Sequence, residues 1–362
     1  MKVIHVINDL TGIGGAEKSL SNIVNEIDTE SVVISLLNID DDIVKHLFDK
    51  SVKVYCLSLS YKSIIRSLRQ FGEIIKAEKP DCIQSWMYAS NVFTSFSSLL
   101  IRHKKPVFWG VHHSLDDIKG EKLTTRIAIF ASKVLDFHPK AIIFCAKKSL
   151  NQHVCYGMCS DKSTFIPNGY YVPASTESLR ERKVFTIGMA GRFHYAKDWN
   201  NGINAVHLFS KNYHDEIRFR IAGHNMDVNN KELNEWLKVF NETNVRVELL
   251  GSISNMTHFY RTLDLFLLSS RTEGFPNVVC EAMSNSVPCI GTDVGDVKYI
   301  IDNCYSVSPP QNPQLLAKEI LRFSSLDEMT HENIRCSSKS RIKNFFSISS
   351  VCRMYMDVWS IK

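Results

Sequence analysis

Two carboxylates stand eight residues apart in the stretch RTEGFPNVVCEAM, at Glu273 and Glu281. The apolar run DLFLLSS (264–270) precedes them, EGFPN breaks it, and VVCEAM restarts at helical spacing. This pattern predicts a strand, a loop with Glu273, and a helix with Glu281. The free N–H groups at a helix N-terminus suit phosphate, whereas a carboxylate further along the helix can accept hydrogen bonds from the vicinal diol of a ribose. The stretch therefore predicts a nucleotide-sugar pocket.

Two cations follow the predicted strand of GMAGRFHYAKDWN, at Arg192 and Lys197. Gly188 and Gly191 flank the end of that strand. A loop separation of five residues lets both cations converge on one diphosphate, Arg192 as a planar fork and Lys197 as a point charge. They would then stabilise the charge that develops on a departing nucleoside diphosphate. The alternative is that Arg192 and Lys197 are solvated surface residues without a ligand. We favour this less, because Glu273 and Glu281 complete a set of charged residues that suits a nucleotide sugar.

Glycines cluster after the first predicted strand, in NDLTGIGGAEKSL, at Gly12, Gly14 and Gly15. A strand that turns into a helix there lets the backbone approach a ligand closely. The dinucleotide pattern G-x-G-x-x-G is incomplete, because Glu17 occupies the third glycine position, and an NAD site is not expected. A tight turn without a ligand and an approach to an acceptor or a phosphate both stay open.

Two histidines end another predicted parallel strand, in PVFWGVHHSLDD, beside Asp116 and Asp117. A lone histidine is usually structural, but a pair at a strand terminus beside two carboxylates favours a site. We expect His112 to line the pocket. A pocket role for His113, and a structural role for either ring, stay open.

The elements that must position these residues form two series in which strands alternate with helices. The first has KVIHVI, SVVISLL, VKVYCL, DCIQSW, PVFWGV and AIIFCA as strands, with helical patterns near 16–27, 62–78, 90–103 and 120–135. The second has VFTIGMA, IRFRIA, VRVELL, DLFLLSS, VPCIG and CYSVS. Such alternation predicts parallel sheets covered by helices on both faces.

The fold class is therefore predicted to be α/β, with two doubly wound, Rossmann-like parallel-sheet domains and an interdomain cleft at the carboxyl ends of the strands. The first domain is expected at 1–168 and the second at 184–340. Residues 169–183 lose periodicity and gather Pro, Gly and Ser, as a linker does. Residues 341–362 are predicted to form a C-terminal helix that crosses back to the first domain.

Length and composition fit this prediction, because 362 residues suffice for two domains with sizeable cores. The hydrophobic fraction of 44% and the charged fraction of 22% are typical of soluble globular proteins. No apolar run approaches the ~18 residues that span a bilayer, and MKVIHVINDL is predicted to be a strand rather than a signal peptide. Ten cysteines without C-x-x-C pairs favour buried, reduced thiols in a cytoplasmic protein.

The net charge of +5 is unevenly placed, since residues 61–150 contain fifteen Lys and Arg against seven Asp and Glu. This stretch includes the helical pattern YKSIIRSLRQFGEIIKAEK and the basic run at 102–105. One interpretation is a surface helix packed on a sheet. The other is attraction to anionic lipid headgroups or to a lipid diphosphate. No basic motif interleaved with aromatic residues indicates nucleic acid as a partner.

Three motifs, in this order along the chain, resemble the family-4 (GT4) retaining glycosyltransferases of the GT-B fold. They are G-G-A-E after the first strand, G-R-F-x-x-x-K-D at the start of the second domain, and E-G-F-P-N-V-V-C-E-A-M, which is similar to the family's E-x7-E signature. The resemblance covers essentially the whole chain. It is particularly close to bacterial enzymes that assemble capsule, O-antigen or exopolysaccharide repeat units.

By that resemblance, Arg192 and Lys197 would hold the donor diphosphate and Glu281 the ribose. Glu273 would contact the donor sugar, and His112 matches a strand-end histidine near that sugar. The further donor-binding positions that the resemblance implies are Gly15, Gly191, Gly251, Ser252, Gly274, Phe275, Pro276 and Asn277. The family uses no catalytic metal, and Asp40-Asp41-Asp42 is interpreted here as a helix cap rather than a metal motif.

The activity implied is transfer of a hexose or N-acetylhexosamine from a nucleotide sugar, preferentially UDP-linked, to a lipid-linked oligosaccharide, without a cofactor. The alternatives are a nucleotide-sugar epimerase on the same fold and a non-catalytic GT-B partner subunit. The expected location is the cytoplasm, with peripheral contact to the inner face of the cytoplasmic membrane as a further expectation.

Overall fold

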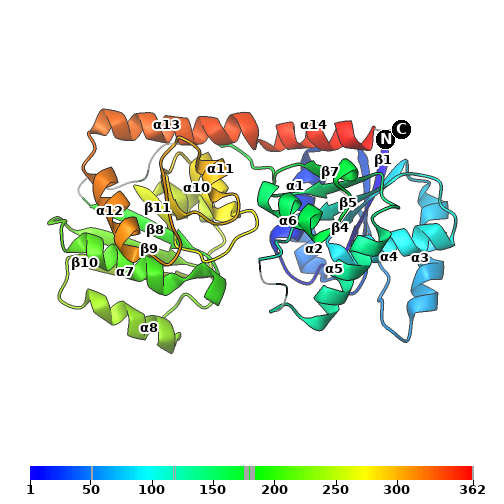
Figure 1. The fold of residues 1–362 in the computed structure, drawn as a ribbon, viewed down its shortest axis with the longest axis horizontal. Helices are drawn as coiled ribbons and strands as arrows, with labels where there is room; N and C mark the ends of the chain where they lie inside the picture. The colour runs from blue at the N-terminus through cyan, green and yellow to red at the C-terminus, as the bar shows by residue number, and fades with distance from the viewer. Residues whose placement is uncertain (50–51, 117, 119, 175–178, 180–183, 361–362) are drawn as a thin grey trace. The chain divides into compact units, whose positions relative to one another are not determined.

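The structure is a computed structural model that describes the chain except residues 50–51, 117, 119, 175–178, 180–183 and 361–362. The chain divides into two compact units, Met1–Gly169 with Ile348–Lys362, and Tyr170–Ser347. Figure 1 shows the helices and strands of both units, coloured from the N-terminus in blue to the C-terminus in red. Much of the segment predicted as a linker, and Asp117, lie outside the described residues.

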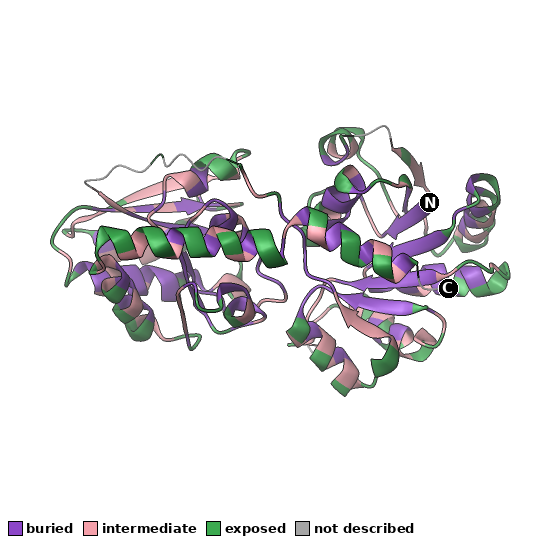
Figure 2. Ribbon diagram, turned by 90° about the horizontal axis from the view of Figure 1, so that it is seen from above, coloured by how far each residue is buried: buried purple, intermediate pink, exposed green. Residues whose placement is uncertain are grey.

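The first unit is built on a seven-stranded parallel sheet in the order β3-β2-β1-β4-β5-β6-β7. The register between the first two strands runs from Lys2 opposite Glu30 to Ile7 opposite Ser35. The strands are β1 (Lys2–Ile7), β2 (Glu30–Ser35), β3 (Lys53–Cys56), β4 (Cys82–Trp86), β5 (Val107–Val111), β6 (Ala141–Phe144) and β7 (Ser163–Phe165). The central strands are almost wholly buried, as their β-branched and aromatic sequences predict, and they are purple in Figure 2.

Helices cover both faces of this sheet. Residues of α1, α2 and α14 pack into one core cluster, and residues of α3, α4 and α5 pack into the cluster on the other face. The helices are α1 (Gly15–Glu26), α2 (Asp41–Leu47), α3 (Ile64–Glu78), α4 (Tyr88–Leu100), α5 (Leu123–Leu135), α6 (Lys147–Tyr156) and α14 (Ile348–Trp359), with a 3-10 turn, η1 (Ser160–Lys162). Asp40 caps α2 by accepting hydrogen bonds from the backbone of Asp42 and Ile43, at 2.9 and 3.1 Å.

The second unit contains a six-stranded parallel sheet in the order β10-β9-β8-β11-β12-β13. The strands are β8 (Phe185–Ala190), β9 (Ile217–Ala222), β10 (Val245–Gly251), β11 (Leu265–Leu268), β12 (Cys289–Thr292) and β13 (Ser306–Ser308). The helices are η2 (Tyr195–Lys197), α7 (Trp199–Ser210), α8 (Lys231–Leu237), η3 (Lys238–Phe240), α9 (Met256–Arg261), α10 (Asn277–Ser284), α11 (Val297–Ile301), α12 (Pro313–Ser324) and α13 (Glu328–Phe345).

Each sheet has one point where the strand order reverses. In the second unit β8 leads to β9 on one side, while its other neighbour is β11. In the first unit β1 has the corresponding position between β2 and β4. The loops that follow such strands diverge and leave a crevice at the carboxyl edge, where ligands of open α/β sheets bind.

The predicted class of two doubly wound parallel sheets is confirmed. The strand β7 was not predicted, because three residues, Ser-Thr-Phe, carry too little hydrophobic pattern. The final helix begins at Ile348 rather than at 341, since α13 continues to Phe345 within the second unit. α14 packs against α1 through Val351, Cys352 and Tyr355, which are buried in the first unit's core.

Candidate functional site

The loop after β8 and the loop after β11 meet at the reversal point of the second sheet, and their charged side chains touch. Lys197 Nζ lies 2.6 Å from Glu273 Oε1, and the side chains are only 21% and 11% exposed. Ser270 Oγ donates a second hydrogen bond to the same carboxylate oxygen, at 2.6 Å. A cation and an acid are thus held together, at the place where the topology opens a crevice.

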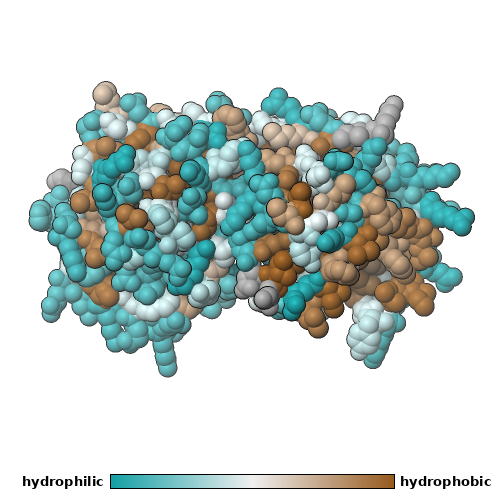
Figure 3. Space-filling model, in the orientation of Figure 1, coloured by the Kyte–Doolittle hydropathy of each residue, from teal (hydrophilic) through white to brown (hydrophobic). Residues whose placement is uncertain are grey.

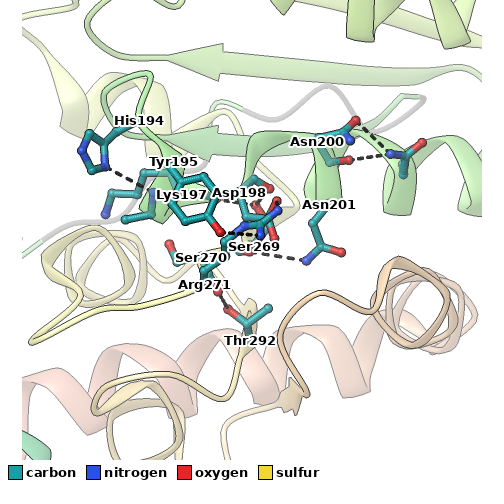
Figure 4. A network of polar contacts seen from close by, with 12 residues as sticks. His194, Tyr195, Lys197, Asp198, Asn200, Asn201, Ser269, Ser270, Arg271 and Thr292 are labelled. Atoms are coloured by element: carbon teal, nitrogen blue, oxygen red, sulfur yellow. Dashed lines mark hydrogen bonds and ion pairs between the residues drawn. The ribbon is translucent and has the colours of Figure 1, made fainter. Parts of the chain in front are cut away.

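A second ion pair fixes the loop that carries Lys197. Arg271 donates from Nη2 to Asp198 Oδ1 at 2.9 Å and from Nη1 to the Tyr195 hydroxyl at 3.0 Å. Its guanidinium also lies over the Tyr195 ring, 4.5 Å from the centroid. Figure 4 shows these side chains around the short helix that ends in Lys197. Because Asp198 is buried, the pair holds the turn in place.

Hydroxyl groups of neighbouring strand ends complete this network. Ser269 Oγ lies 3.0 and 2.9 Å from the carbonyl oxygens of Lys197 and Asp198. Thr292, at the end of β12, donates its hydroxyl to the Ser270 carbonyl at 2.7 Å (Figure 4). The three loops are therefore tied to one another by side chain to backbone bonds, which set the position of Lys197 and of Glu273.

Glycines with positive φ let the loops approach closely. Gly191 and Gly223 directly follow β8 and β9, and Gly251 is the last residue of β10; their φ angles are +152°, +143° and +60°. A Cβ on Gly223 would lie 1.8 Å from the Gly191 carbonyl oxygen. A Cβ on Gly295, after β12, would lie 2.5 Å from the carbonyl oxygens of Glu273 and Gly274. Only glycine fits at these two positions.

Glu281 lies on α10, as predicted, and Glu273 lies in the loop before that helix. The carboxylate of Glu281 accepts a hydrogen bond from the hydroxyl of the buried Tyr260, at 2.9 Å. Burial, and then the adjacent Glu281 carboxylate, raise the pKa of Tyr260 far above its usual value. Tyr260 therefore remains a neutral donor that orients Glu281.

The segment that enters α10 is packed by aromatic rings. Phe275 is buried, and its ring stacks with Tyr170 at 6.4 Å. The Tyr170 hydroxyl donates to Asn277 Oδ1 at 2.5 Å. Pro276 is buried and Gly274 half-buried, so this segment offers mainly backbone to a ligand.

Arg192 and Ser252 are exposed residues of the second unit. Arg192 follows β8 directly, and its carbonyl accepts a hydrogen bond from Trp199 Nε1 at 3.1 Å. Its guanidinium has no ion pair or hydrogen bond within the described part of the chain. Ser252 follows Gly251 at the end of β10. Arg192 thus has a fixed backbone and a side chain that is available for an anion.

In the first unit, the glycines after β1 lead into α1 as predicted. The Glu17 carboxylate turns back and accepts a hydrogen bond from the Gly14 N–H at 3.0 Å. Burial raises the pKa of Glu17. A carboxylate at this helix N-terminus occupies a donor that an anion would use, and it favours the tight-turn interpretation for Gly14. A ligand role for Gly15 stays a prediction.

The two histidines after β5 have different surroundings. Both ring nitrogens of His112 are inaccessible to solvent, and the ring lies 5.3 Å from that of Trp86. The Asn168 side chain interacts with the ring and partly offsets the effect of burial on its pKa. Burial lowers the pKa of His112 to about 4, so the ring is neutral near pH 7. His113 instead pairs with Glu121 through Nε2 at 2.9 Å. His113 is thus paired with a carboxylate, whereas His112 makes no ion pair within the described residues.

No group of three or more His, Cys, Asp or Glu that could hold a metal ion occurs among the described residues. Metal independence remains a prediction. Within the same part of the chain, no helix has the length and hydropathy to cross a membrane.

The structure thus brings two of the predicted site residues, Lys197 and Glu273, into contact. The other predicted site residues of the second unit are Gly191, Arg192, Gly251, Ser252, 274–277 and Glu281. His112 and Gly15 belong to the other unit. Sequence reasoning did not identify five residues that shape this site, which are Gly223, Tyr260, Ser270, Arg271 and Gly295. Gly223 and Gly295 each follow a predicted strand directly or closely, which is the pattern that could have indicated them.

Known proteins resemble both halves of the chain. Residues 13–172 match the family described as Glycosyltransferase Family 4, and residues 184–325 match the family described as Glycosyl transferases group 1. The capsular polysaccharide biosynthesis glycosyltransferase CapM of Staphylococcus aureus is 26% identical over 166 residues, which cover 45% of this chain and 42% of CapM. The chain therefore matches less than half the length of that relative.

Two solved structures match along almost their whole length. Anabaena Alr3699/HepE in complex with UDP and glucose has a TM-score of 0.79 at 17% identity, with 99% of each chain covered. The lipopolysaccharide outer core galactosyltransferase WaaB, in its apo form, has a TM-score of 0.74 at 16% identity, also with 99% of each chain covered. At this identity the likeness concerns the fold.

Proposed function

The chain belongs to the GT4-like glycosyltransferases of the GT-B fold, and from that premise we propose that it transfers a hexose or N-acetylhexosamine from a UDP-sugar to a lipid-linked oligosaccharide. The product would be a repeat unit of a surface polysaccharide. Relatives named for capsular polysaccharide and lipopolysaccharide synthesis support this process. A structural neighbour whose structure contains UDP supports uridine diphosphate as the nucleotide of the donor.

The observation that carries the proposal is the contact between Lys197 and Glu273 at the reversal point of the second sheet. A diphosphate needs cations, and a sugar needs an acceptor of hydrogen bonds. The two loops supply Lys197 and Arg192 for the first and Glu273 for the second. Glu281, oriented by Tyr260, would accept hydrogen bonds from the ribose hydroxyls.

In the proposed reaction the bond between C1 of the sugar and the β-phosphate oxygen breaks, while an acceptor hydroxyl bonds to C1 from the same face. The acceptor proton passes to the departing phosphate, and the configuration at C1 is retained. Arg192 and Lys197 would stabilise the charge on the leaving UDP. His112, neutral because burial lowers its pKa, would offer a hydrogen bond to the sugar without adding charge.

The proposed acceptor implies a location in the cell. A lipid-linked oligosaccharide is assembled at a membrane surface, so we place the enzyme in the cytoplasm at the inner face of the cytoplasmic membrane. No metal or cofactor is part of this proposal.

The test is a donor panel. The protein is incubated with UDP-glucose, UDP-galactose and their N-acetylated counterparts, with and without membrane lipid extract, and UDP release and labelled glycolipid are measured. We expect one donor to give glycolipid only when lipid is present. UDP release with free sugar in the absence of lipid would instead identify the epimerase alternative, and no turnover with any donor would favour a non-catalytic subunit.

The variant Arg192→Ala tests the proposed role of this arginine at the leaving diphosphate. We expect at least a hundredfold loss of kcat, because the leaving charge loses one stabilising donor, with an unchanged melting temperature. Arg246→Ala, at an exposed arginine of the edge strand β10, is the control and should retain activity. Unchanged turnover in Arg192→Ala contradicts the assignment.

A further inference from the structure

Helix α5 exposes a continuous apolar stripe. Leu123, Ile127, Phe130 and Val134 are 68%, 58%, 60% and 56% exposed. Their spacing of four, three and four residues places them on one face of the helix. Phe137, three residues further, is 62% exposed. The opposite face of α5, with Ile129 and Ser132, is the one buried against the sheet.

The end of α4 extends this stripe. Phe96, Leu99 and Leu100 are 51%, 43% and 60% exposed, and α4 packs against α5. Ser95 of α4 and His138, after α5, are hydrogen-bonded at 2.9 Å, so the segments that carry Phe96 and Phe137 lie together. Figure 3 shows hydrophobic side chains gathered over this part of the first unit. We call these eight side chains the α4–α5 apolar surface.

A basic groove adjoins the apolar surface. Ile101, directly after α4, packs on Gly72 of α3, where a Cβ would lie 3.5 Å from the Ile101 side chain. Between these segments is a groove of about 740 Å³. The charged residues that line it are Arg69, Glu73, Lys76, Lys79, Arg102, Lys104 and Lys105. Lys105 faces Asp81 at 3.9 Å, whereas Lys76, Lys79 and Lys104 make no ion pair within the described residues.

Exposed apolar residues beside exposed cations also occur on α3 and at α5, outside the groove. Ile65 is 81% exposed beside Lys62 and Arg66, which are also exposed. Lys122, directly before α5, and Arg126, in its first turns, flank the apolar stripe and are exposed. The exposed apolar residues of α3 and α5 therefore stand beside cations, and Glu73 is the one carboxylate among the charged residues that line the groove.

We propose that the α4–α5 apolar surface and the basic groove together dock on an anionic lipid bilayer. Soluble proteins rarely expose so large a contiguous apolar area without a partner. Apolar side chains on a helix face enter the boundary between headgroups and acyl chains, and adjacent cations bind anionic headgroups. A second copy of the chain is the less suitable occupant, because a symmetric interface would bring the two basic rims together. This inference does not rest on the identity of the transferred sugar.

Flotation of the full chain with lipid vesicles tests the proposal. Vesicles of phosphatidylcholine with about 30% phosphatidylglycerol are compared with vesicles of phosphatidylcholine alone, because the charge of the leaflet supplies the attraction. We expect binding to the anionic vesicles that weakens at about 0.5 M NaCl, where the Debye length falls to a few ångströms. Binding to neutral vesicles should be weaker by roughly tenfold or more.

Two double variants separate the contributions. Ile127→Ser with Phe130→Ser removes apolar area, and Lys104→Glu with Lys105→Glu reverses charge at the groove. Each should weaken binding to the anionic vesicles by roughly tenfold or more. The matched controls change exposed residues of the second unit: Val228→Ser with Met329→Ser, and Lys318→Glu with Lys343→Glu. These should bind as the unchanged chain does.

Melting temperature and UDP binding are measured on every variant, so that loss of fold or of the donor site is distinguished from loss of docking. Equal binding of all variants, or no binding to anionic vesicles at low salt, overturns the proposal. Light scattering gives a further decisive outcome. A dimer that Ile127→Ser with Phe130→Ser dissociates, together with absent vesicle binding, would assign this surface to a second copy of the chain.

Discussion

Lys197 and Glu273 form an ion pair across two strand-end loops, and a donor diphosphate would have to compete with the carboxylate for the ammonium group. The contact joins residues 76 positions apart and lies between β8 and β11, which are neighbours in the sheet. Ser270 holds Glu273 through the same oxygen that receives Lys197. The carboxylate therefore keeps one partner when the lysine turns to a phosphate.

We predict that Lys197→Ala lowers kcat/KM for the donor by about a hundredfold or more, since one of two cations on the leaving diphosphate is lost. The melting temperature should change little, because Ser270 still satisfies Glu273. Initial rates over a range of donor concentrations check this. Lys211→Ala, at an exposed lysine after α7, is the control, and equal rates for both variants would contradict the role of Lys197.

Arg271 is predicted to act on catalysis through the position of Lys197. Arg271→Ala leaves the buried Asp198 without its ion pair, and we expect a loss of about 1–3 kcal/mol in the free energy of unfolding. The donor KM should rise because the turn that carries Lys197 loosens. Arg271→Lys keeps the charge but not the fork or the ring contact, so it should restore only part of both losses. Thermal melts and donor KM values, measured together, test this, and full activity of Arg271→Ala would refute it.

Gly223 is predicted to be the least replaceable glycine near the site. Gly223→Ala places a Cβ against the Gly191 carbonyl at a φ of +143°, and should cost about 3 kcal/mol or more in the stability of the second unit. Gly12→Ala is the matched control, since a Cβ there meets nothing within 4 Å. Circular dichroism melts and UDP titrations of both variants give the comparison. A stable Gly223→Ala with normal UDP affinity would mean that the loops separate easily.

The sequence was informative where the pattern is local. Alternating strands and helices predicted both sheets, and Asp40 was correctly interpreted as a helix cap. The motif spacing placed Glu273 in a loop and Glu281 on a helix, as observed. The roles of these residues toward a donor remain proposals.

What the sequence did not indicate depends on contacts between distant segments. Tyr260 orients Glu281 from the preceding helix, and Arg271 reaches Asp198 across 73 positions. Neither pair has a characteristic spacing. The exposed stripe of α5 was also not predicted, because the spacing of its apolar residues is the same whether that face packs or faces solvent.

The first unit is predicted to be sensitive to acid because of its buried histidines. Burial lowers the pKa of His5 to about 3 and those of His112 and His153 to about 4, from 6.5. Between pH 6.5 and 4 the unfolded chain therefore binds more protons than the folded one, and the free energy of unfolding falls as the pH is lowered through this window. The total loss is of the order of several kcal/mol. In the second unit, His207 is the one described histidine with a lowered pKa.

Urea unfolding at a series of pH values, followed by pulsed hydrogen exchange at one fixed pH, resolves the two units in the intact chain. Peptides of β1, β5 and α6 should lose protection at lower urea as the pH falls from 6.5 to 4, and the loss should continue below pH 4, because the folded-state pKa of His5 is about 3. His153→Gln removes one of the first unit's histidines with a lowered pKa, which also include His103 and His138, and should make this dependence shallower. If the variant keeps the full slope, or if the second unit is the more sensitive one, buried neutral histidines are not the cause.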